Sequence, residues 1–155
     1  MMKILCDFDG VLTDISAEAH RVKEIFTQTL LQNNGSDAGR VEAVLNRGRN
    51  ELKQNPHRHG WRHKGRIAAY ADEDSFLANV GLSHCLDDLS RTENGDFLKI
   101  SQSLNRRGIA SFNQASLEAY QTMAAETQAE KRNPVDPDAV RFLERAIRTG
   151  HRITV

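Results

Sequence analysis

The sequence has few cysteines and no surplus of charge of either sign. Only Cys6 and Cys85 stand in the 155 residues, and they form neither a CxxC metal-binding pair nor a disulfide framework. We therefore expect reduced thiols and a cytoplasmic protein. The 21 basic and 21 acidic side chains cancel, so charge gives no reason to expect a nucleic-acid partner.

Long apolar runs are also missing. No run approaches the roughly 20 residues of a membrane-spanning helix, so we expect no membrane partner. The apolar stretch near the N-terminus is interrupted by Asp7 and Asp9, which does not fit a secretory signal peptide. Apolar residues make up 39% of the chain and charged residues 27%, which is typical of a globular domain.

Residues 3–14 read KILCDFDGVLTD and carry the clearest chemical pattern. Residues 3–6 are nearly all apolar, which predicts a central strand covered on both faces. Asp7 and Asp9 follow this strand directly. Two carboxylates so close repel each other unless one is protonated or a cation lies between them. Mg²⁺ takes such oxygen ligands together with water and substrate phosphate.

A magnesium ion bound by Asp7 and Asp9 gives the two acids different roles. Asp7 can stay ionised as a nucleophile, while Asp9 carries a proton as general acid and later acts as base. Gly10 allows a tight turn and offers an unobstructed N–H to an anion, so we include it among the substrate-binding residues. The reaction that suits these groups is phosphoryl transfer.

DFDGVLTD resembles the first motif of the haloacid dehalogenase-like (HAD) hydrolases, in the form found in their phosphatases. The resemblance covers residues 3–14 closely and residues 134–155 more loosely. It implies that Asp7 is the nucleophile that forms an aspartyl-phosphate. It also implies that Asp9 is the acid/base residue and that the backbone carbonyl of Asp9 binds Mg²⁺. The implied substrate is a small phosphorylated metabolite.

The resemblance also implies a domain organisation within the α/β class. Residues 1–14 and 134–155 would form an incomplete Rossmann-like HAD core of parallel strands. Residues 15–133 would be a large, mainly helical cap insertion between them. The function of such a cap in the family is to close over the site and select the substrate.

The later motifs of the family are not found in these residues. A Ser or Thr, a Lys or Arg and an acidic pair would follow, and no strand after residues 152–155 can carry them. Because a two-stranded parallel sheet cannot cover itself, we expect an N-terminal part of a longer protein with little turnover alone. A non-catalytic phosphate-binding or regulatory module and a phosphomutase remain alternatives, and oligomeric state is not predicted.

Helical spacing of apolar residues dominates between the two ends. Helices are expected over about residues 16–33, 37–54, 75–90 and 97–104, from Ser111 or Asn113 to about residue 131, and over 137–149, with a strand after them. Ser36, Asp74 and Asp136 are expected N-caps, and Gly150 ends the last helix. Leu117, Tyr120 and Met123 recur at helical spacing and predict core positions.

Residues 56–66, PHRHGWRHKGR, are basic and lack periodicity, so they predict a loop. Arginine side chains can hold a phosphate and Trp61 can stack on a flat ring, which makes Trp61, Arg62 and Arg66 candidate substrate-binding residues. A plainer interpretation is a solvated loop with Trp61 packed against the helices. The three histidines of this segment lack a fourth ligand for zinc.

Overall fold

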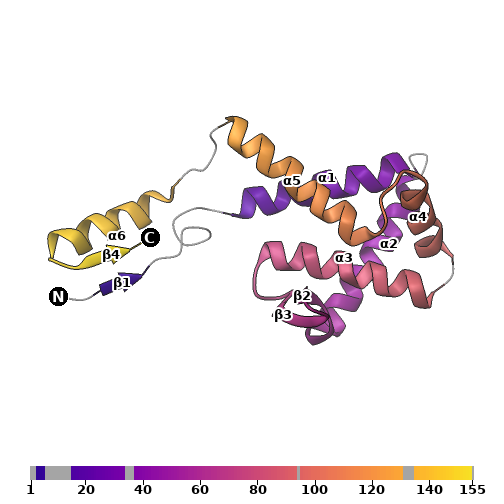
Figure 1. Ribbon diagram of the computed structural model, residues 1–155, viewed down its shortest axis with the longest axis horizontal. Helices are drawn as coiled ribbons and strands as arrows, with labels where there is room; N and C mark the ends of the chain where they lie inside the picture. Colours follow the sequence, from indigo (N-terminus) through magenta and orange to yellow (C-terminus); the bar gives the residue numbers. More distant parts are fainter. Residues whose placement is uncertain (1–2, 6–14, 34–36, 94, 131–134, 155) are drawn as a thin grey trace.

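The computed structural model describes residues 3–5, 15–33, 37–93, 95–130 and 135–154, which are mostly helical (Figure 1). The helices are α1 (Ser16–Asn33), α2 (Ala38–Gln54), α3 (Ser75–Thr92), α4 (Asp96–Arg106), α5 (Phe112–Glu130) and α6 (Pro137–Arg148), with a 3-10 turn η1 (Pro56–Arg58). The strands are β1 (Lys3–Leu5), β2 (Gly60–His63), β3 (Arg66–Tyr70) and β4 (Arg152–Thr154). None of these helices has the length and apolarity needed to cross a membrane.

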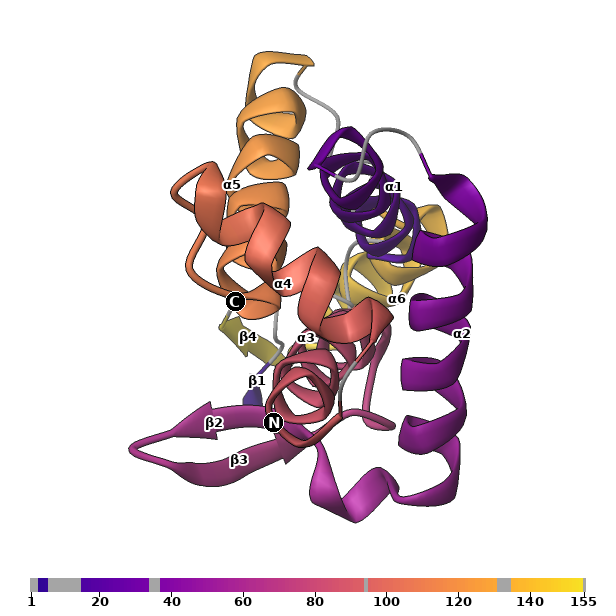
Figure 2. The same cartoon turned by 90° about the vertical axis from the view of Figure 1, so that its right-hand side faces the viewer.

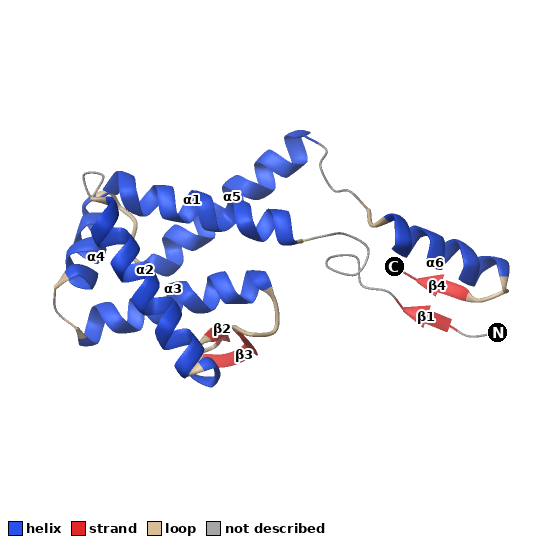
Figure 3. Cartoon of the chain, turned by 180° about the vertical axis from the view of Figure 1, so that it is seen from behind, coloured by secondary structure: helices blue, strands red, loops and turns tan. Residues whose placement is uncertain are grey.

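The two ends of the chain meet in one small sheet. Strands β1 and β4 pair in parallel, with Ile4 opposite Ile153. Helix α6 precedes β4 and packs beside it, and the three elements lie apart from α1–α5 (Figures 1 and 3). The predicted strands at both ends are therefore confirmed as a mixed α/β arrangement. Within the described residues this pair is the whole parallel sheet, and no larger Rossmann-like core is present.

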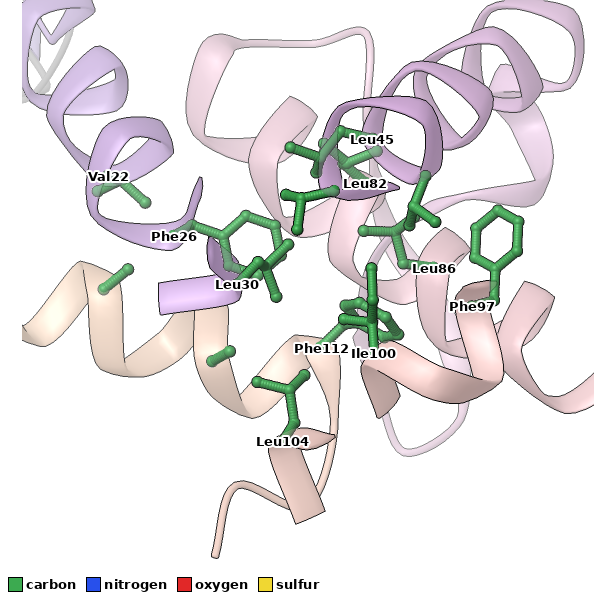
Figure 4. Packing of buried hydrophobic residues seen from close by; sticks show 14 of the residues in the cluster. Val22, Phe26, Leu30, Leu45, Leu82, Leu86, Phe97, Ile100, Leu104 and Phe112 are labelled. Carbon is green, nitrogen blue, oxygen red and sulfur yellow. The ribbon is translucent and has the colours of Figure 1, made fainter. Parts of the chain in front are cut away.

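Helices α1–α5 and the β2–β3 hairpin form one unit, which we call the helical domain. Its core is a continuous cluster of buried apolar side chains from all five helices (Figure 4). The largest fully buried members are Phe112, Leu30, Leu86, Ile100 and Leu104. Because apolar residues recur every three or four positions along each helix, each helix presents one apolar stripe to this cluster.

Several helix boundaries follow the predicted capping chemistry. Asp74 caps α3, where its Oδ1 accepts from the N–H of Leu77 at 2.7 Å. Asp136 caps α6, and Gly150 takes a positive φ of 81° just after that helix. The cap of α2 was predicted one residue too early. Asp37, not Ser36, caps this helix through a 3.0 Å bond from the N–H of Arg40.

The prediction of a loop over residues 56–66 is wrong. After η1 the chain forms the antiparallel β2–β3 hairpin (Figure 2). The two turn residues, Lys64 and Gly65, have φ values of 50° and 77°. Positive φ at both positions is the requirement of a tight hairpin turn that matches strand twist. Residues 67–70 alternate between half-buried and exposed positions, as is typical of a strand. The basic composition of residues 56–66 concealed this signal in the sequence.

The base of the hairpin lies very close to α3. A Cβ atom added at Gly81 would lie 2.5 Å from the Cβ of Ala71, which follows β3. The Ala71 N–H donates to the carbonyl of His59 at 3.3 Å, which closes the base of the hairpin. Small residues on both sides therefore set the distance between hairpin and helix.

Candidate functional site

The predicted acidic loop lies outside the described residues. Asp7, Asp9 and Gly10 follow β1 in the chain, and their roles in catalysis, magnesium binding and substrate binding stay predictions. Within the part of the chain that the structure describes, no group of three or more His, Cys, Asp or Glu side chains is placed to hold a metal ion.

A cavity of about 400 Å³ opens in the helical domain between α1, β2, α3 and α5, and we call it the aromatic pocket. Its lining residues are Val22, Trp61, Arg62, Phe76, Asn79, Val80, His84, Asn113, Ser116, Leu117 and Tyr120. The structure thus brings together two predicted substrate-binding residues, Trp61 and Arg62. Arg66, the third, is exposed on β3 and is not part of this lining.

The prediction that Leu117, Tyr120 and Met123 are all core residues is correct only for Met123, which is 3% exposed. Leu117 and Tyr120 are 52% and 48% exposed. They border the aromatic pocket and lie on a different face of α5 from Ala115 and Ala119, which pack into the core. Helical spacing identifies neighbours on a helix but does not distinguish a core from the wall of a cavity.

The polar wall of the pocket is a hydrogen-bonded network around Asn113. Its Nδ2 lies 3.2 Å from Ser83 Oγ and 3.3 Å from His84 Nε2. The Ser83 hydroxyl donates to the carbonyl of Val80 at 2.8 Å, so it must accept from Asn113. His84 Nε2 then accepts the second Nδ2 proton, which places the imidazole proton of the neutral ring on Nδ1.

Burial favours the same neutral state of His84. Removal from water lowers the pKa of His84 below its ordinary 6.5, and the positive charge of Arg62 lowers it further, while Asp87 and Asp88 oppose the shift. In this neutral form of His84, Nδ1–H is the one donor of the ring, and Nε2, its one acceptor, is bound to Asn113. The wall therefore carries a fixed pattern of donors and acceptors.

Arg62 is the one charged side chain among the described residues of the pocket lining. Its Nη2 donates to Asp88 Oδ2 at 2.9 Å, and both side chains are about one-third exposed. The ion pair ties β2 to α3 and neutralises the guanidinium beside the cavity. Arg62 therefore contributes shape and orientation more than free charge.

A second cavity of about 480 Å³ has a different character, and we call it the cationic pocket. Lys23, Arg49 and Lys53 surround it, and in the part of the chain that the structure describes Asp72 is the one acid of its lining. Leu52, Pro56, Ala71, Ala78, Asn79 and Leu82 supply the rest of its surface. The helical domain thus offers one neutral, aromatic cavity and one cavity with an excess of positive charge.

Asp87 lies behind the aromatic pocket and fixes the start of α5. Although it sits in α3, its Oδ1 accepts from the N–H of Phe112 at 2.8 Å and its Oδ2 from the N–H of Asn113 at 3.1 Å. It is only 8% exposed. Burial raises the pKa of this carboxyl above its ordinary 3.8, although the two backbone donors act in the opposite direction. The carboxylate positions Asn113 for its contacts with the pocket wall.

Cys85 is a buried thiol and takes no part in either cavity. Its Sγ donates to the carbonyl of Gly48 at 3.7 Å, and burial raises the pKa of the thiol to about 12. The side chain is therefore a protonated packing residue at neutral pH.

His59, which closes the hairpin base, is buried without a hydrogen bond to either ring nitrogen within the described residues. The nearest carboxylate oxygen, Oε1 of Glu51, lies 3.8 Å from Nε2. That distance is too long for a hydrogen bond. Burial lowers the pKa of His59 below 6.5, with Asp88 and Glu51 opposing the shift. The ring is therefore neutral in the fold and costs free energy to protonate.

We expect the helical domain to lose stability as pH falls from about 7.5 to about 5.5. In the unfolded chain His59 and His84 take up protons near their ordinary pKa of 6.5, whereas in the fold they do so only at lower pH. Protons therefore bind the unfolded state first and favour it. Urea unfolding at several pH values measures the slope, and His59→Leu should make it shallower.

The exposed His57 provides the matched control for this measurement. His57→Leu removes an imidazole from the surface and should leave the slope of stability against pH as in the wild type. An equal slope in His59→Leu and the wild type would contradict a neutral, buried His59.

No protein-family model matches the sequence, and comparisons with curated proteins and with solved structures find no match.

Proposed function

We propose that the protein is a magnesium-dependent phosphatase of the HAD type. It would remove the phosphate of a small phosphorylated metabolite through an aspartyl-phosphate intermediate. One observation carries the proposal: the acidic motif DFDGVLTD begins two residues after β1, a strand that pairs in parallel with β4 after the helix α6. In α/β sheets, ligands bind at the carboxyl ends of the strands, and Asp7 follows such an end.

Each acid has one role in the proposed reaction. Asp7 attacks the phosphorus atom, and the bond to the alcohol oxygen breaks as Asp9 gives that oxygen a proton. Asp9 then takes a proton from water, whose oxygen attacks the aspartyl-phosphate and releases inorganic phosphate and free Asp7. The donor set of Asp7 and Asp9 fits Mg²⁺, which would screen the negative charges of nucleophile and substrate.

The helical domain is proposed as the cap of this enzyme. It lies between the first strand and the last helix of the chain, in agreement with a division into residues 1–14 and 134–155 as core and 15–133 as insertion. Trp61 and Arg62 are the cap residues proposed to face the substrate, with Gly10 at the phosphate. Arg66 is a weaker candidate because it lies outside the lining of both cavities.

Hydrolysis of an aryl phosphate by the full-length protein tests the proposal. With Mg²⁺, Asp7→Asn should abolish turnover because the amide is no nucleophile. Asp9→Asn should lower kcat by about 10²–10⁴-fold through loss of general acid and base catalysis. Chelation of Mg²⁺ by EDTA should stop the reaction, and added Mg²⁺ should restore it.

Glu42→Gln is the control variant, because Glu42 is an exposed acid of the helical domain that lies outside the lining of both cavities. It should retain wild-type turnover. Binding of inorganic phosphate without any hydrolysis would instead identify a phosphate-binding module. Transfer of the phosphate to a second hydroxyl of the substrate would identify a phosphomutase.

A further inference from the structure

We infer that the aromatic pocket of the helical domain is a binding site for a neutral, planar heteroaromatic ring. Its volume of about 400 Å³ is within the range of small-molecule sites. The pocket contains Trp61 and Arg62, which we propose as substrate-facing residues of the phosphatase, so the inference adds a ligand class to that proposal. It concerns equilibrium binding and does not depend on turnover.

Two exposed aromatic side chains provide surfaces on which a ring can stack. Trp61 from β2 and Tyr120 from α5 are each 48% exposed, although both belong to the lining of the cavity. Phe76 packs edge-on against Tyr120, with ring centroids 5.6 Å apart and an interplanar angle of 73°. This contact restrains Tyr120 from the side while it leaves part of its ring accessible.

The pocket also contains polar atoms that the protein does not use. Ser116 is only 5% exposed, and its hydroxyl has no hydrogen bond within the described ranges. Asn113 uses both Nδ2 protons on Ser83 and His84, which leaves its Oδ1 as an acceptor. Neither atom is fully buried, since the buried side-chain atoms without a partner in the described residues are the ring nitrogens of His59. Both atoms are therefore accessible to a ligand with donors and acceptors along an edge.

Charge distinguishes this ligand from a phosphate. Among the described lining residues the charged one is Arg62, and it is already paired with Asp88 at 2.9 Å. An anion would gain more from the cationic pocket, where the described lining holds Lys23, Arg49 and Lys53 against one acid. The aromatic pocket is therefore suited to an uncharged heterocycle, which gains from stacking and from hydrogen bonds at its edge.

Trp61 gives a direct measurement, because it is the only tryptophan in the chain. Adenine, cytosine and nicotinamide are titrated into the full protein, and both Trp61 fluorescence and the heat of binding are recorded. At least one should give a saturable change in both signals. Tyr120→Ala should weaken that binding by about 5–50-fold, in line with the loss of one stacking partner. Ser116→Ala should weaken it by about 3–10-fold, as expected for one hydrogen bond.

Tyr70→Ala is the matched control, because Tyr70 is 45% exposed on the same hairpin and lies outside the pocket lining. It should keep the affinity of the wild type. The inference is overturned if none of the three rings binds, if Tyr70→Ala weakens binding as much as Tyr120→Ala, or if inorganic phosphate competes with the ring.

Asp7→Asn separates this inference from the phosphatase proposal. The variant should bind the ring with unchanged affinity, since Asp7 is not part of the pocket lining. Ring binding without phosphatase activity in the wild type would contradict only the proposed reaction. Phosphatase activity without ring binding would contradict only the inference about the pocket.

Discussion

Phe112→Ala should lower the free energy of unfolding of the helical domain by about 3–5 kcal/mol, the usual cost of removing a buried phenylalanine. Phe112 is the first residue of α5 and is completely buried. It lies in the cluster with Ile100 and Leu104 from α4 and Leu86 from α3 (Figure 4). Its ring therefore joins three helices, and its loss leaves a cavity that rigid neighbours cannot fill.

Urea unfolding followed by circular dichroism measures this loss of stability. Phe142→Ala is the matched control, because the same side chain is removed from α6, where it is 57% exposed. We expect a change within about 0.5 kcal/mol in the control, as for most surface substitutions. A Phe112→Ala variant as stable as the wild type would show that α5 does not pack on α3 and α4 in this way.

Asp87→Ala should lower the free energy of unfolding by about 2–4 kcal/mol, because α5 loses its cap and two backbone N–H groups lose their acceptor. The carboxylate accepts from the N–H groups of Phe112 and Asn113 at 2.8 and 3.1 Å. These are among the N–H groups at the start of α5 that have no partner within the helix. At this nearly buried position water cannot easily replace the carboxylate.

Two variants test the cause of the Asp87 effect by urea unfolding at neutral pH. Asp87→Asn keeps one acceptor oxygen in a side chain of the same shape, so it should cost less than Asp87→Ala. Asp88→Ala removes the next acid of α3, whose ion pair with Arg62 is partly exposed, and should cost about 0–1 kcal/mol. Equal losses in Asp87→Ala and Asp88→Ala would contradict a capping role for Asp87.

The sequence allowed the helices and their ends to be predicted where the signal is local. Asp74 and Pro137 mark helix starts through their own hydrogen-bonding and dihedral preferences, and the structure has helices there. The paired strands at the two chain ends were also predictable, since Lys3–Leu5 begins a short, mostly apolar run and Arg152–Thr154 follows shortly after the helix-ending Gly150. These features depend on a few neighbouring residues, which the sequence alone displays.

The hairpin and the contact of Asp87 with the start of α5 were not predicted, for different reasons. The alternation in residues 67–70 is short, and the basic residues before it concealed the Lys64–Gly65 turn. Ser111, one of the two predicted helix starts, does accept from the N–H of Gln114 at 3.0 Å. The N–H of Phe112, however, donates to Asp87, which is 25 residues earlier in the sequence. A capping residue on another helix leaves no pattern around the helix that it caps.

The candidate site was predicted only in part. Trp61 and Arg62 were chosen for their chemistry, and the structure places both beside one cavity. Ser116, His84 and Asn113 were not chosen, because nothing in the spacing of three common polar residues indicates a shared cavity. Their grouping depends on the packing of α3 against α5, which arises from the tertiary structure.

The close approach of Gly81 and Ala71 makes the position of the hairpin sensitive to substitution at these two residues. A Cβ atom added at Gly81 would lie 2.5 Å from the Cβ of Ala71, so a larger side chain at either position must move the hairpin away from α3. Trp61 lies on β2 and would move with the hairpin, whereas Tyr120 lies on α5 and would not. Larger side chains at these two positions would therefore change the spacing between the two rings, although neither position belongs to the described lining of the aromatic pocket.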